Sequence, residues 1–122
     1  MTVMLTAIDP STGETVREVP AAGPAEIETV LERAESAYGE WRRAGFDERA
    51  KLLRAVGAEL RRGIEDYAYV MTEEMGKPIT EARGEVVKAA WAAEHYADHG
   101  EQYLATEYVE SDATSSYVQY LP

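Results

Sequence analysis

Apolar residues recur every three or four positions through three successive segments of this chain. That spacing places them on one face of an α-helix and predicts helices over residues 24–44, 48–75 and 78–104. Pro24 suits the first turn of the first helix, where a missing N–H is no loss. Because each predicted helix has an apolar face, the fold must cover three such faces.

The segment Gly76-Lys77-Pro78 separates the second helix from the third. Glycine accepts the left-handed cap of one helix, and proline both prevents continuation and opens the next. Earlier in the chain, Gly45 ends the first predicted helix and Asp47 is placed to cap the second. The sequence therefore predicts a corner at residues 76–78.

The second predicted helix is long for a chain of 122 residues. Residues 48–75 would extend about 40 Å as one helix, whereas a compact domain of this length is roughly 35 Å across. The length of this helix equals or exceeds the diameter of the domain unless Gly57 or Gly63 bends the helix.

Short β-structure is predicted on both sides of the helices. Apolar segments flank a turn at residues 9–13, which predicts a β-hairpin before residue 20. After Leu104 the residues rich in Tyr, Val, Thr and Ser predict two strands, the second over residues 116–121. A last strand that stops at Pro122 suggests a chain cut within its fold.

Charge and composition exclude several classes of function. The formal net charge is −11, from 23 acidic and 12 basic residues, which repels phosphate backbones and argues against a nucleic-acid partner. The arginine pairs at 42–43 and 61–62 lie among acids and are interpreted as solvated helix faces. No apolar run reaches membrane-spanning length and no signal peptide is recognisable, so we expect a cytoplasmic protein without a membrane partner.

The absence of cysteine removes disulfides, thiolate metal sites and a cysteine nucleophile. A phosphate-binding loop would need glycine and Ser or Thr where Met71 and Pro78 stand. His95 and His99 are four apart and could share a zinc ion with Glu94 or Asp98. The His-Glu-x-x-His order is missing, however, so a solvated pair is the favoured interpretation.

Other polar and aromatic groups carry no clear chemistry. The helical carboxylates Glu73, Glu74, Glu81 and Glu85 are interpreted as solvated faces. The strand tyrosines, which could stack a ligand, are more typical of packing or interface residues; these are Tyr108, Tyr117 and Tyr120. We predict no catalytic, cofactor-binding or metal-binding residue in this chain.

The stretch EEMGKPITEARGEV, residues 73–86, resembles a signature near the start of NAD(P)-dependent aldehyde dehydrogenases. Three further stretches resemble the same family in the same order: IDPSTGETV at residues 8–16, RRAGFDERAKLLRAVGAEL at 42–60 and YVESDATSSYVQYLP at 108–122. Asp9 stands where the family usually has asparagine. Taken together, these stretches are most similar in sequence to the succinate-semialdehyde dehydrogenase type.

The resemblance implies the N-terminal part of an α/β aldehyde dehydrogenase fold. Residues 1–105 would be the hairpin and helices that pack on the nucleotide-binding domain, and residues 106–122 would enter the oligomerisation region. The family's cysteine nucleophile, its glutamate and asparagine, and its NAD or NADP contacts all lie beyond this segment. Lys77 would belong to a structural corner.

The resemblance further implies a truncated oxidoreductase. The complete enzyme would oxidise an aldehyde, such as succinate semialdehyde, with NAD or NADP. This segment alone would bind no cofactor and be inactive. Its expected partners are the remaining aldehyde dehydrogenase domains or subunits, together with copies of itself. The alternative is a free-standing helical module that docks on full-length aldehyde dehydrogenase subunits.

Overall fold

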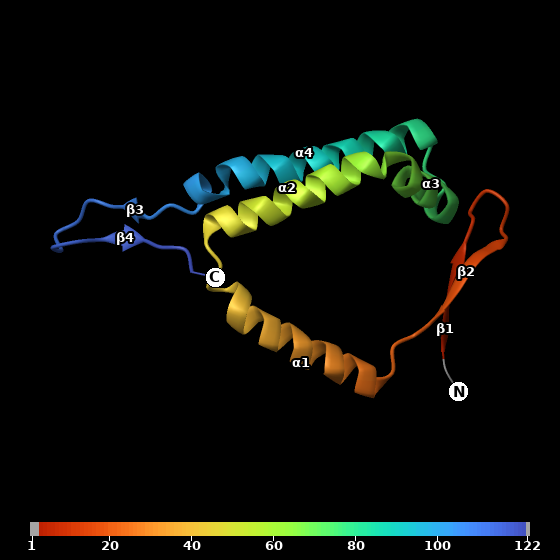
Figure 1. Ribbon diagram of the computed structural model, residues 1–122, viewed down its shortest axis with the longest axis horizontal. Helices are drawn as coiled ribbons and strands as arrows, with labels where there is room; N and C mark the ends of the chain where they lie inside the picture. The colour runs from red at the N-terminus through yellow and green to blue at the C-terminus, as the bar shows by residue number, and fades with distance from the viewer. Residues whose placement is uncertain (1–2, 122) are drawn as a thin grey trace.

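The computed structural model describes residues 3–121 and places a β-hairpin, four helices and a second, shorter hairpin in chain order (Figure 1). The elements are β1 (Met4–Ile8), β2 (Thr15–Pro20), α1 (Pro24–Trp41), α2 (Phe46–Arg62), α3 (Ile64–Met75), α4 (Ile79–Tyr103), β3 (Glu107–Tyr108) and β4 (Tyr117–Val118).

The first hairpin is formed as predicted, with β1 antiparallel to β2. Its turn is held by Asp9, whose Oδ1 accepts hydrogen bonds from the backbone N–H and the hydroxyl of Ser11, both at 2.7 Å. Gly13 has a φ of 76°, a conformation that glycine adopts without strain. The bonds from Ser11 lower the pKa of Asp9, so the turn favours the ionised carboxylate.

The core of the molecule is the contact between α2 and α4, which run antiparallel, with α3 packed against α4 (Figure 1). Small residues make this contact close. A Cβ at Gly57 would lie 3.0 Å from Cγ of Glu94 and 3.2 Å from the carbonyl oxygen of Ala90. Within residues 3–121 the buried hydrophobic side chains are Ala68, Ala82, Val86 and Ala90.

The helix predicted over residues 48–75 is divided in two at Gly63, one of the two glycines at which the sequence allowed a bend. There the backbone leaves the helical region, with φ −100° and ψ 21°. The ring of Tyr67 occupies the space beside it, 2.6 Å from where a Cβ would stand. Four helices therefore replace the three predicted, and α3 turns away from the axis of α2 (Figure 1).

The predicted ends of several elements also need correction. Helix α1 ends at Trp41, before Ala44, and α2 begins at Phe46 with Gly45 as its N-cap. Because α2 begins at Phe46, Asp47 lies inside its first turn, where the negative charge interacts favourably with the helix dipole. No side chain caps this helix. Strand β4 covers two residues of the predicted 116–121, because its only partner in the described structure is the equally short β3.

Helix α1 lies apart from the other helices, joined to α2 by residues 42–45 (Figure 1). None of its residues is buried, and it takes part in none of the larger contacts between elements. Its apolar face therefore remains exposed, including Ile27, Val30, Leu31 and Tyr38. In the part of the chain that the structure describes, no helix is long and apolar enough to cross a membrane.

Candidate functional site

The corner between α3 and α4 has the predicted geometry. Gly76 ends α3 in the left-handed conformation, with φ 70°, and donates its N–H to the Thr72 carbonyl at 2.9 Å. Pro78 is the N-cap of α4, and its carbonyl accepts the N–H of Glu81 at 2.9 Å. A helix leads into this corner, whereas a phosphate-binding loop follows a strand.

The side chain of Lys77 is engaged at the corner itself. Its Nζ lies 2.7 Å from Oε1 of Glu85, and only 21% of the side chain is exposed. The hydrogen bond from Lys77 holds the pKa of Glu85 below its ordinary value. Lys77 thus ties the corner to the first turns of α4.

The first hairpin also meets this corner. A Cβ at Gly76 would lie 2.8 Å from Cγ of Pro10, so glycine is required both for its φ and for this close approach. Arg17 of β2 lies 3.7 Å from the carboxylate of Glu74. The corner is therefore a junction of three elements, a role consistent with a structural motif.

His95 and His99 are brought together on α4, but their geometry does not suit a shared metal ion. Their rings stack, with centroids 4.4 Å apart and planes 21° from parallel, so their lone pairs do not converge. Nε2 of His95 lies 2.8 Å from the Tyr103 hydroxyl, and Nδ1 of His99 donates to the His95 carbonyl at 2.9 Å. Among residues 3–121 no three His, Asp or Glu side chains are grouped to hold a metal.

The carboxylates that could complete such a site are paired with arginines of α2. Glu94 accepts two hydrogen bonds from Arg61, each at 2.7 Å, and Asp98 accepts one from Arg54 at 2.8 Å. These hydrogen bonds lower the pKa values of Glu94 and Asp98. A general acid at neutral pH needs a raised pKa, so these carboxylates are poor candidates for that role.

The tyrosines at the C-terminal hairpin form a cross-strand pair. Tyr108 and Tyr117 are direct partners in the β3–β4 ladder, with ring centroids 5.9 Å apart. Both rings are exposed. Aromatic pairs of this kind stabilise an antiparallel ladder, so these two rings contribute to the pairing of β3 with β4.

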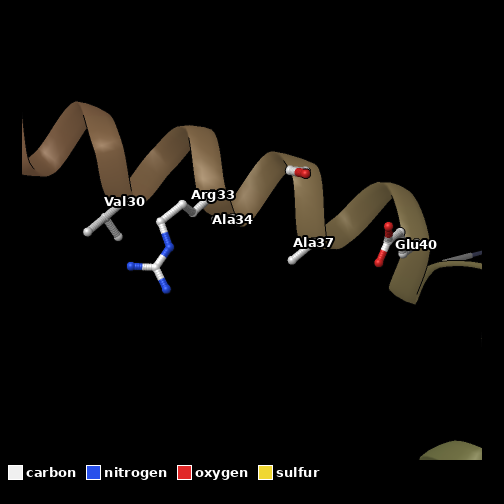
Figure 2. A pocket seen from close by; sticks show the side chains of 6 residues that line it. Val30, Arg33, Ala34, Ala37 and Glu40 are labelled. Atoms are coloured by element: carbon white, nitrogen blue, oxygen red, sulfur yellow. The ribbon is translucent and has the colours of Figure 1, made fainter.

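The described structure has several surface hollows, of which two concern α1 and its junction with α2. Figure 2 shows one that is lined only by residues of α1, including Val30, Arg33 and Glu40, and it is an open helix face. The other, about 660 Å³, lies where the α1–α2 loop meets residues 119–121. Sequence reasoning did not single out Arg49, which lines this second hollow, because its partners are backbone atoms that periodicity does not reveal.

Comparison with known proteins gives a match along nearly the whole chain. The family described as the aldehyde dehydrogenase family matches residues 2–122. The chain is 39% identical over 116 residues to a succinate semialdehyde dehydrogenase [NAD(P)+] of Escherichia coli (strain K12). It is 36% identical over 118 residues to a probable succinate-semialdehyde dehydrogenase [NADP(+)] of Synechocystis sp.. These matches cover 95% and 97% of this chain but 25% and 26% of the relatives.

Solved structures agree with the sequence matches. A succinic semialdehyde dehydrogenase from Streptococcus pyogenes, solved with NADP+, superposes with a TM-score of 0.85 at 36% identity. The superposition covers 92% of this chain and 25% of that one. The predicted aldehyde dehydrogenase-type fold is thereby confirmed. These 122 residues belong to the aldehyde dehydrogenase family and span about a quarter of the length of the curated relatives that they match.

Proposed function

We propose that this chain is the N-terminal part of an NAD(P)-dependent aldehyde dehydrogenase and needs the remaining parts of such an enzyme to act. The observation that carries the proposal is the coverage: the alignment takes in 95% of this chain and 25% of the Escherichia coli relative. The substrate class is a small aldehyde that bears a carboxylate, as in the succinate semialdehyde of the relatives' names.

The reaction of the complete enzyme would use the cysteine thiolate and the dinucleotide contacts that the resemblance implies. This chain has no cysteine, so it cannot itself form a thiohemiacetal. Its contribution would be structural. The exposed apolar face of α1 would cover part of the nucleotide-binding domain, and β3 and β4 would lead into the oligomerisation region.

The test is complementation of an incomplete relative. A form of the Escherichia coli enzyme that lacks the stretch aligned with this chain is assayed for NADH or NADPH production from succinate semialdehyde. The purified 122-residue chain alone should give none, and adding it to the incomplete enzyme should restore activity. Leu31→Asp in the apolar face of α1 should weaken the restoration, whereas Ser36→Asp, which adds the same charge on the opposite face, should not.

Two outcomes would overturn the proposal. Aldehyde-dependent reduction of NAD(P)+ by the pure chain would contradict the structural role. Tight binding to the full-length relative, without restoration of the incomplete enzyme, would favour a free-standing module that docks on whole subunits.

A further inference from the structure

Helix α1 is joined to the rest of the molecule only through the short loops at its two ends, residues 21–23 from β2 and residues 42–45 into α2. It has no buried residue, and the larger contacts between elements in the described structure join other pairs. Figure 1 shows it leaving the α2–α4 pair at residues 42–45 and ending away from every other helix. Its direction relative to the α2–α4 pair is therefore set by contacts at its ends, and the C-terminal end is the one that adjoins α2.

Arg49, in the first turns of α2, makes three contacts with Trp41, the last residue of α1, and with the loop that follows it. Its Nη2 donates to the Trp41 carbonyl at 2.7 Å, and its Nε donates to the Ala44 carbonyl at 3.0 Å. The guanidinium also lies over the Trp41 ring, 5.1 Å from its centroid. The last carbonyls of a helix carry partial negative charge and lack helical partners, so a cation that donates to them caps the helix.

The guanidinium is suited to this position because it is planar and has several donors in a rigid arrangement. It can bond two carbonyls while one face stays against an aromatic ring, whereas a lysine ammonium acts as a point charge. The Trp41 carbonyl also accepts the Ala44 N–H at 3.0 Å, so the loop is tight where Arg49 binds.

We propose that Arg49 is a positioning residue that sets the angle between α1 and the α2–α4 pair. By joining the end of α1 to the start of α2, it directs the exposed apolar face of α1 before any partner covers that face. The inference concerns the chain by itself and holds whether or not the proposed enzymatic role is correct.

Spin labels can measure this angle, because the chain contains no cysteine. One pair, at Glu28→Cys and Lys88→Cys, reports the position of α1 relative to α4. A second pair, at Lys51→Cys and Lys88→Cys, reports the α2–α4 packing. Glu28 lies about 20 Å along the helix from Trp41, so a rotation of about 20° at the junction moves the label by about 7 Å.

Arg49→Ala should broaden or shift the α1–α4 distance by several ångströms and leave the α2–α4 distance sharp. Arg49→Lys, which keeps the charge, should broaden it less. Arg54→Ala is the matched control, since Arg54 lies on the same helix and bonds to Asp98 of α4. It should leave the α1–α4 distance as in the parent.

The proposal fails if Arg49→Ala leaves the α1–α4 distribution unchanged, or if the parent distribution is already as broad as that of the variant. Equal broadening in Arg54→Ala would also contradict it. Loss of the sharp α2–α4 distance in both Arg49 variants would contradict it as well. Such a loss would mean that Arg49 is needed for the α2–α4 packing, beyond any role at the end of α1.

Discussion

At the scale of single residues, Gly76 has the most constrained position in the described structure. Its φ of 70° is left-handed, and its hydrogen atoms face Pro10 of the hairpin turn. Both requirements exclude a side chain: the conformation disfavours Cβ, and the space for Cβ is filled. The residue therefore joins local backbone geometry to a contact between segments that are far apart in the chain.

Gly76→Ala should destabilise the chain by about 1–2 kcal/mol, the cost of a left-handed non-glycine residue, with a further loss where Cβ meets Pro10. The measurement is urea unfolding followed by far-UV circular dichroism. Gly84→Ala is the control, since Gly84 lies inside α4 with nothing within 4 Å of its would-be Cβ. That variant should gain about 0.5–1 kcal/mol. An unchanged midpoint in Gly76→Ala would show that the corner tolerates a side chain.

At the scale of elements, α2 and α4 are held together by the close approach of small residues and by ion pairs at the edge of their contact. Gly57 is the buried residue of α2, and Ala82, Val86 and Ala90 are those of α4. Small side chains bury little apolar area, so the pairing depends on close fit. Changes of a single methyl group at the contact should therefore be measurable.

Gly57→Ala tests that fit. Alanine normally favours a helix over glycine, but here its Cβ would stand 3.2 Å from the Ala90 carbonyl oxygen. We expect a net loss of about 1–3 kcal/mol from overpacking, read from the urea midpoint. Gly84→Ala again serves as the control, and a Gly57→Ala variant that gains stability as Gly84→Ala does would contradict the tight contact.

The ion pair between Arg61 and Glu94 predicts a dependence of stability on pH. The hydrogen bonds from Arg61 hold the pKa of Glu94 below its ordinary value of 4.5 in the folded state. A carboxylate with a lowered folded pKa stabilises the fold above its unfolded pKa. That stabilisation is lost as the pH falls through the folded pKa.

The urea midpoint of the parent should accordingly fall as the pH drops from about 6 to about 3. Arg61→Gln, which lacks the pair, should show a smaller fall than the parent. Arg43→Gln removes the same charge outside α2 and α4 and should follow the parent closely. Parallel pH profiles for all three proteins would mean that this pair contributes nothing to the pH dependence.

At the scale of the whole molecule, exposed apolar surface and net charge act in opposite directions. The α1 face is uncovered, and so are Tyr117, Val118, Tyr120 and Leu121 at the C-terminal end. Uncovered apolar patches and strand edges recruit other chains. A net charge of −11 opposes that association.

Added salt should therefore promote self-association of the purified chain, because it screens the repulsion between copies. Light scattering across a salt series measures the mass, and near-UV circular dichroism reports tertiary order. Val118→Lys, which places a charge on the short strand edge, should associate less at each salt concentration. A monodisperse parent with sharp near-UV bands at every salt concentration would contradict the expectation.

Much of the secondary structure follows from the sequence because it depends on neighbouring residues. Helical spacing of apolar residues located α1 and α4 to within a few positions, and the Asp9 turn and the Gly76 cap follow from local chemistry. The sequence motif at residues 73–86 indicated the aldehyde dehydrogenase family, and the comparisons confirm that assignment. These features need no knowledge of distant contacts.

Only the tertiary structure decided between the two glycines of the long second helix. Both weaken a helix equally by propensity, but Gly63 is next to the Tyr67 ring and breaks the helix, whereas Gly57 faces Ala90 and continues it. The role of Arg49 was likewise decided in space, since its partners are backbone carbonyls whose positions depend on where α1 ends. Sequence patterns indicate which residues favour a helix and which apolar faces need to be buried. The contacts between distant segments determine where the helices bend and which apolar face remains exposed to solvent.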